Sequence, residues 1–101
     1  MGLFGFGKKS ISSKEIDNVV MSHFKKLGSP IDIEQKTHKA RFMEMLNELD
    51  KWAESLGFGS WKRSAIHASV EGVLQETYRN RGFDDIVTTY VDMSFKIIMK
   101  T

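Results

Sequence analysis

The chain has 101 residues, a formal net charge of +2, 41% hydrophobic residues and 28% charged residues. This composition is typical of a single globular domain that is soluble in water. The absence of cysteine excludes disulfides, thiolate zinc sites, iron–sulfur clusters and a thiol nucleophile. The net charge is too small to indicate a polyanionic partner by itself, and no apolar run approaches the ~18–20 residues of a transmembrane helix. We therefore expect a cytoplasmic protein.

The first ten residues differ from the rest in composition. Residues 1–10 combine glycines, lysines and three bulky apolar side chains, so they predict a flexible terminus ahead of a single helical domain at 11–101. The stretch is too short for a signal peptide, and its charges lie on the wrong side. An alternative is a weak membrane anchor, in which Leu3, Phe4 and Phe6 enter the headgroup region beside the lysines.

The first helix is predicted over 13–27. Ser12 and Glu15 have the spacing of a capping box, and Gly28 is placed to end the helix. Apolar residues recur between them at helical spacing, at Ile16, Val19, Val20, Phe24 and Leu27.

A second helix is predicted over 30–56, with Pro30 at its first position. Its interval 34–41 is almost entirely polar, so we expect that part to be more exposed. Gly57 is expected to end the helix, and Phe58 to fold back on it, as in a Schellman motif.

The third helix is predicted over 60–81, capped by Ser60 and ended by Gly82. Its interior Gly72 costs about 1 kcal/mol relative to Ala, which predicts a close approach of another helix at that point.

The last segment permits two interpretations. Residues 86–98 alternate and contain many β-formers, which favours a strand. The same segment also has apolar residues at helical spacing, and no other segment offers a strand to pair with it, so we predict a helix over 84–100. The fold class is then all-α, an up-and-down bundle of four helices in which sequential neighbours pack side by side.

Three polar side chains suggest a weak metal site in the bundle. The turn after the first helix is expected to bring His23 near Glu34 and His38, which together could form an open site with three ligands. The simpler interpretation is that His23 lies at the edge of the core and the others are solvated. We therefore predict no metal and no other cofactor.

The segment 49–66 resembles the helix-turn-helix family over some 18–20 residues. Ala53 and Gly57 have the spacing that this motif requires, and apolar residues surround them. The resemblance implies DNA binding by the side chains that would open the recognition helix, namely Lys62, Arg63 and Ser64.

The segment also departs from the family pattern. Arg63, which we expect to be exposed with Lys62, stands where the family has a buried Val or Ile. The acidic residues Asp50 and Glu54 close to the corner would repel phosphates, whose attraction dominates the affinity for DNA.

No arrangement of residues predicts catalysis. The acids fall on polar helix faces, and neither a nucleophile motif nor a phosphate-binding loop is present. We therefore expect a non-enzymatic interaction or regulatory module that binds another protein or itself, with the DNA-binding and metal-binding functions as alternatives. The apolar count is generous for four helices, and the candidate partner-binding residues are Phe42, Met45, Trp52, Phe58 and Trp61.

Overall fold

A computed structural model describes residues 11–27, 36–79 and 82–100 of the chain. These residues form four helices, α1 (Ser13–Leu27), α2 (Lys36–Ser55), α3 (Ser60–Thr77) and α4 (Asp84–Met99), and within these ranges there is no strand. The all-α prediction is thus confirmed, including a helix as the last element. The predicted start of the second helix at residue 30 and the predicted flexible terminus at 1–10 lie outside the described residues.

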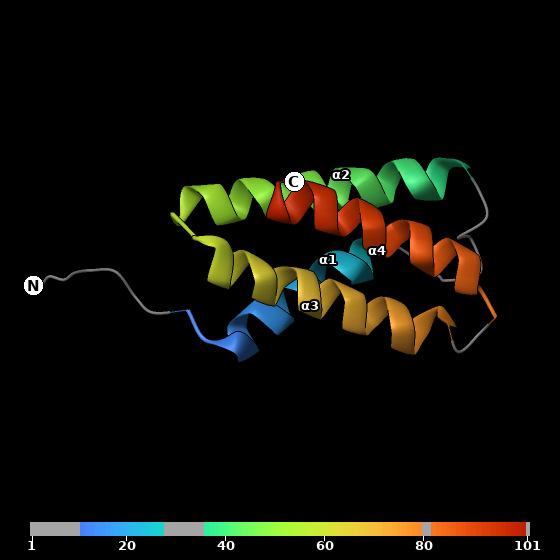
Figure 1. Ribbon diagram of the computed structural model, residues 1–101, viewed down its shortest axis with the longest axis horizontal. Helices are drawn as coiled ribbons and strands as arrows, with labels where there is room; N and C mark the ends of the chain where they lie inside the picture. Colours follow the sequence, from blue (N-terminus) through green and yellow to red (C-terminus); the bar gives the residue numbers. More distant parts are fainter. Residues whose placement is uncertain (1–10, 28–35, 80–81, 101) are drawn as a thin grey trace, which may run out of the picture.

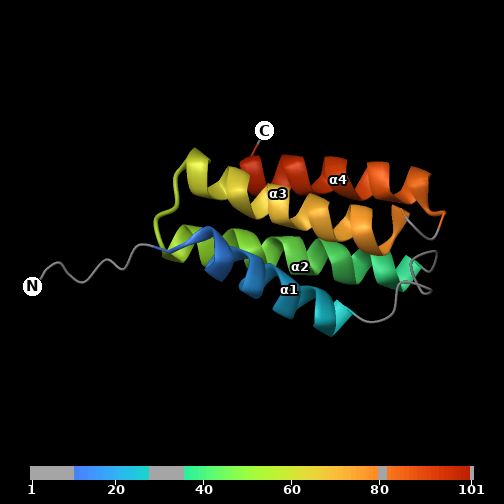
Figure 2. The same ribbon diagram turned by 90° about the horizontal axis from the view of Figure 1, so that it is seen from below.

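The helices form two layers, and each helix runs antiparallel to the one before it (Figures 1 and 2). One layer holds α1 and α2 and the other holds α3 and α4. Across the layers α1 packs on α3 and α2 packs on α4, so that α2 and α3 lie on a diagonal and meet only slightly. The expectation that all sequential neighbours pack side by side is therefore wrong for α2 and α3.

The start of α1 follows from local chemistry. The Ser12 backbone N–H donates to Glu15 Oε1 at 3.1 Å, and the Glu15 N–H donates to Ser12 Oγ at 3.2 Å. These reciprocal bonds confirm the predicted capping box.

A Schellman motif connects α2 to α3, as predicted. Gly57 has φ +67°, its N–H donates to the Glu54 carbonyl at 3.1 Å, and the Phe58 N–H donates to the Ala53 carbonyl at 3.0 Å. Glycine is favoured there because other residues rarely adopt this left-handed conformation.

The third helix is shorter than predicted. The α-helix ends at Thr77 instead of 81, and the chain continues as a tighter turn through Arg79. Such tightening is common in the last turn of a helix. Gly82, with φ +88°, donates its N–H to the Arg79 carbonyl at 3.0 Å, so it closes the turn as expected.

The core contains a buried polar side chain that sequence periodicity did not place there. His38 is 0% exposed, its ring is stacked on Tyr90 at 5.9 Å between centroids, and its Nδ1 lies 3.0 Å from the Tyr90 hydroxyl. The expectation of an exposed start to α2 is therefore wrong at His38. Burial also raises the pKa of Tyr78 and of Tyr90 to about 12.

Gly72 does not mark a close approach between helices. It is exposed on α3, and a Cβ added at this position would meet no atom within 4 Å. Within the described part of the chain, no packing contact explains a glycine in the middle of this helix.

Candidate interaction surface on α3

The corner between α2 and α3 is built on aromatic packing. The rings of Trp52 and Phe58 lie 5.3 Å apart at 76°, an edge-to-face contact that fixes the chain as it leaves α2. Both side chains are partly buried against the core. The corner therefore presents the start of α3 on a firmly packed support.

Arg63 lies inside the bundle, in contrast to the expected exposure. It is only 8% exposed, and its Nη1 donates to Asp50 Oδ1 at 2.6 Å and to the Ile98 carbonyl at 3.0 Å. Its Nη2 donates to Glu54 Oε1 at 3.4 Å. The guanidinium is thus hydrogen-bonded to α2 and α4. Arg63 therefore no longer supports the nucleic-acid hypothesis.

The position of Arg63 has a sequence explanation. It precedes Ile66, Val70 and Leu74 at helical spacing, and all three are buried. Arg63 therefore continues the inward face of α3, where the acids at the end of α2 balance its charge.

Lys100 shares these carboxylates. Its Nζ lies 3.2 Å from Glu54 Oε1 and 3.5 Å from Asp50 Oδ1. The hydrogen bond to Glu54 and the charge of Asp50 raise the pKa of Lys100. The two acids expected to repel DNA are thus paired with cations of the protein itself.

The other two nucleic-acid candidates remain at the surface but differ in their contacts. Lys62 is half-buried, its Nζ contacts the Ile11 carbonyl, and it lies 5.9 Å from the Phe58 ring centroid and 5.8 Å from that of Trp61. Ser64 is exposed. The structure therefore does not bring the three candidates together as one exposed set.

The five candidate partner-binding residues also differ in their exposure. Phe42 and Met45 are 0% and 5% exposed, and Phe42 stacks on the ring of Tyr90 at 4.1 Å between centroids. Both belong to the inward stripe of α2, so neither side chain is on the surface of the folded bundle. Trp61, by contrast, is 74% exposed.

Trp61 begins a stripe along the outward side of α3, in which Trp61, Ala68 and Gly72 are exposed and Ala65 is partly buried against the core. We call this stripe the outer face of α3, and it consists of Trp61, Ala65, Ala68 and Gly72. Residues at this spacing lie above one another on a helix. None of the four is charged, and the exposed acid Glu76 follows Gly72 by one turn on the same side of α3.

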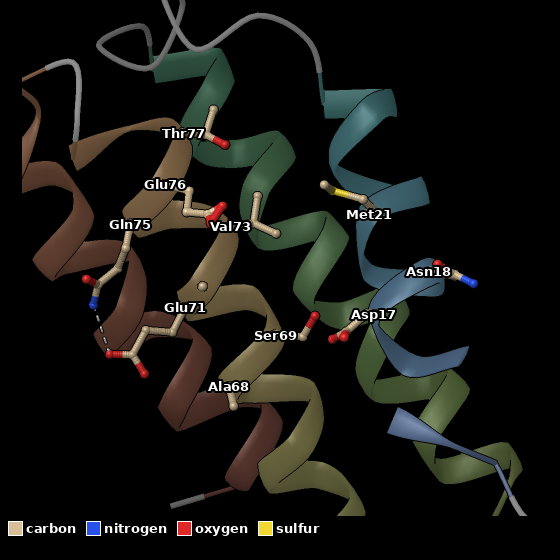
Figure 3. Close-up of a pocket in the computed structure, with 11 residues that line it drawn as sticks. Asp17, Asn18, Met21, Ala68, Ser69, Glu71, Val73, Gln75, Glu76 and Thr77 are labelled. Atoms are coloured by element: carbon tan, nitrogen blue, oxygen red, sulfur yellow. Dashed lines mark hydrogen bonds between the residues drawn. The ribbon is translucent and has the colours of Figure 1, made fainter. Parts of the chain in front are cut away.

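Exposed apolar side chains from both neighbouring helices flank this face. Met21 of α1 is 48% exposed and Phe95 of α4 is 44% exposed. A hollow of about 760 Å³ lies between α1 and α3, lined by Met21, Ala68 and Gly72 among others. In Figure 3, Met21 extends from α1 toward Val73 of α3 across this hollow. Sequence reasoning missed the face because its small residues give no apolar signal.

The proposed metal ligands have other contacts. His23 Nδ1 lies 2.9 Å from the Val19 carbonyl and its Nε2 lies 3.5 Å from Glu48 Oε1, whereas His38 is paired with Tyr90 in the core. Glu34 lies outside the described residues. Across 11–27, 36–79 and 82–100, no group of three potential ligands is placed to hold a metal ion.

The third histidine lies between α3 and α4. His67 Nδ1 is 2.9 Å from Ser94 Oγ, and its ring meets Phe95 edge-on at 5.5 Å between centroids. Burial lowers the pKa of His67, and the charge of Glu71 partly opposes this shift. The neutral imidazole is thus favoured in the folded protein.

A comparison of the chain with protein-family models, curated proteins and solved structures finds no match. Among the described helices, none is both long enough and apolar enough to cross a lipid bilayer.

Proposed function

We propose that this chain is a small, non-enzymatic cytoplasmic module that binds a protein helix through the outer face of α3. The partner is another protein or a second copy of the chain. The observation that carries the proposal is the exposure of Trp61, at 74%, at the start of a stripe of small uncharged residues on α3.

Exposure of a tryptophan matters because this side chain contributes more than others to protein interfaces. Tryptophan is enriched among residues whose truncation costs 2 kcal/mol or more of binding free energy. Its apolar area gains free energy when it leaves water, at roughly 25 cal/mol per Å². Met21 and Phe95 extend the apolar area on either side of α3.

The small residues of this face support a helix as the partner structure. Side chains such as Ala65, Ala68 and Gly72 allow two helix axes to approach closely, because little side-chain volume lies between them. A loop or strand would gain less from such a smooth surface. The face therefore suits a partner helix with one apolar side.

The test is recovery of partners by a tagged protein from the cells that produce it. We expect Trp61→Ser to remove partner proteins that the unsubstituted chain retains. Met43→Ser is the matched control, because Met43 is 42% exposed but lies on α2. Equal recovery with all three proteins would contradict the use of the α3 face.

A further inference from the structure

We propose that the partner helix is α3 of a second copy, packed antiparallel, with Trp61 of each chain seated on Gly72 of the other. The pair has two-fold symmetry, with the axis passing midway between Ile66 and His67. This inference rests on the proposed function and names the occupant of the same face.

The sizes of the side chains match across this axis. An antiparallel pair centred there places Trp61 opposite Gly72 and Ala65 opposite Ala68, at both ends of the contact. The largest residue of the stripe thus meets the smallest, and the two of intermediate size meet each other. A two-fold interface requires such self-complementarity, because one surface supplies both sides.

The space required for Trp61 is present in the structure. Nothing lies within 4 Å of a Cβ added at Gly72, and this residue lines the hollow between α1 and α3. Trp61 and Gly72 are roughly 16 Å apart along the helix at 1.5 Å per residue, so the two tryptophans do not compete for one site. The hollow also offers Met21 as an apolar wall for the incoming indole.

The charges of α3 select the antiparallel direction. Arg63 in its first half is buried and paired with Asp50, so the surface charge of 60–68 comes from Lys62, whereas its second half, 69–77, contains Glu71 and Glu76 and no base. Antiparallel packing places the basic half of one helix beside the acidic half of the other. Parallel packing would instead place like charges together and Trp61 against Trp61.

The glycine itself is also explained by this arrangement. A glycine inside a helix costs about 1 kcal/mol relative to alanine, and no contact within the described chain requires Gly72. A residue with a larger side chain would occupy the place of the second chain's indole.

The first experiment is sedimentation equilibrium of the full chain from ~1 μM to ~1 mM, the range in which weak dimers form. We expect a monomer–dimer equilibrium, with the dissociation constant raised at least tenfold by Trp61→Ser and by Gly72→Leu. Leucine favours the helix more than glycine does, so loss of folding would not explain the second result. Met43→Ser should dimerise like the unsubstituted protein.

The second experiment tests the direction. The chain lacks cysteine, so Ala65→Cys and Ala68→Cys each introduce a single thiol. When one variant is labelled with ¹⁵N and the two are mixed and oxidised, we expect mass spectrometry to show mainly disulfides between the two different variants. Disulfides mainly within each variant would overturn the antiparallel register.

Two further outcomes would overturn the inference. One is a monomer at every concentration up to ~1 mM, and the other is a dimer that neither Trp61→Ser nor Gly72→Leu weakens. If the protein is monomeric but recovery of other proteins still requires Trp61, the second copy is excluded and the proposed function stands. If Trp61 is required in neither assay, both proposals fail.

Discussion

At the scale of single residues, Arg63 shows how an ion can replace an apolar side chain in the core. Arg63 lies on the inward face of α3, as its helical spacing from the buried residues of that helix predicts. Hydrogen bonds join its guanidinium to α2 and α4. A buried cation of this kind is stable only while its partners remain, because the transfer of charge out of water is costly.

We expect Arg63→Ala to destabilise the protein by about 2–4 kcal/mol. The substitution leaves the Ile98 carbonyl without its side-chain donor, removes one of the two cations beside Asp50 and opens space in the core. Urea unfolding followed by circular dichroism measures the change. Lys51→Ala is the control, since Lys51 is exposed on α2, and an equal effect of both substitutions would contradict the role of Arg63.

His67 gives the stability a dependence on pH in mildly acidic solution. Its folded pKa lies below 6.5 because burial disfavours the charged ring, so the unfolded chain binds the proton more readily. The contribution of this residue is complete above about pH 6.5 and is lost as the pH falls toward the folded pKa.

We expect the loss of stability that His67 causes at low pH to disappear in His67→Gln, whose side chain can still hydrogen-bond to Ser94. The stability difference between the unsubstituted protein and this variant should shrink or reverse between pH 7.5 and pH 5, when measured by urea unfolding. The carboxylates titrate in both proteins, so their effect on the free energy of unfolding cancels in the difference. A difference that is constant with pH would refute the assignment to His67.

At the scale of the helices, three glycines have two different roles. Gly57 and Gly82 have φ of +67° and +88° and end their helices, whereas Gly72 is an exposed residue within α3. The same substitution should therefore change stability in opposite directions.

We expect Gly72→Ala to stabilise the folded monomer by about 0.5–1 kcal/mol, because alanine favours the helix and space is available. Gly57→Ala and Gly82→Ala should each destabilise it by about 1 kcal/mol, because alanine is strained at positive φ. Thermal unfolding at low protein concentration measures the monomer. Stabilisation at all three positions would contradict these roles.

Much of the helical structure could be predicted from the sequence, since it depends on neighbouring residues. Ser12 with Glu15 and Gly57 with Phe58 are local signals, and both motifs are present as expected. The helical spacing of Arg63 from Ile66 places it on the inward face of α3, but its burial also requires the acids of α2, which no pattern within α3 contains. The burial of His38 similarly depends on Tyr90, which is distant in the sequence.

The candidate surface was predicted only in part for the same reason. The generous apolar count names Trp61, Phe42 and Met45 alike, but Trp61 is 74% exposed whereas Phe42 and Met45 lie in the core. Periodicity assigns residues to one side of a helix without deciding which sides neighbouring helices cover. The outer face of α3 became evident only when its neighbours were in place.

At the scale of the whole molecule, the protein consists of two helical hairpins, α1–α2 and α3–α4. Each hairpin lies in one layer, and the packing of α1 on α3 and of α2 on α4 joins the layers. Contacts within a hairpin are closer in sequence than contacts between hairpins, so their loop-closure entropy is smaller. We therefore expect the hairpins to form before they associate.

The diagonal placement of α2 and α3 has a consequence for assembly. Because these helices share little contact, the four residues between them can straighten without breaking the packing inside either hairpin. The α3–α4 hairpin of one chain can then occupy the same place on the α1–α2 hairpin of another, which is a domain swap. The Gly57 turn is therefore the segment that would have to change conformation for the bundle to close between two chains instead of within one.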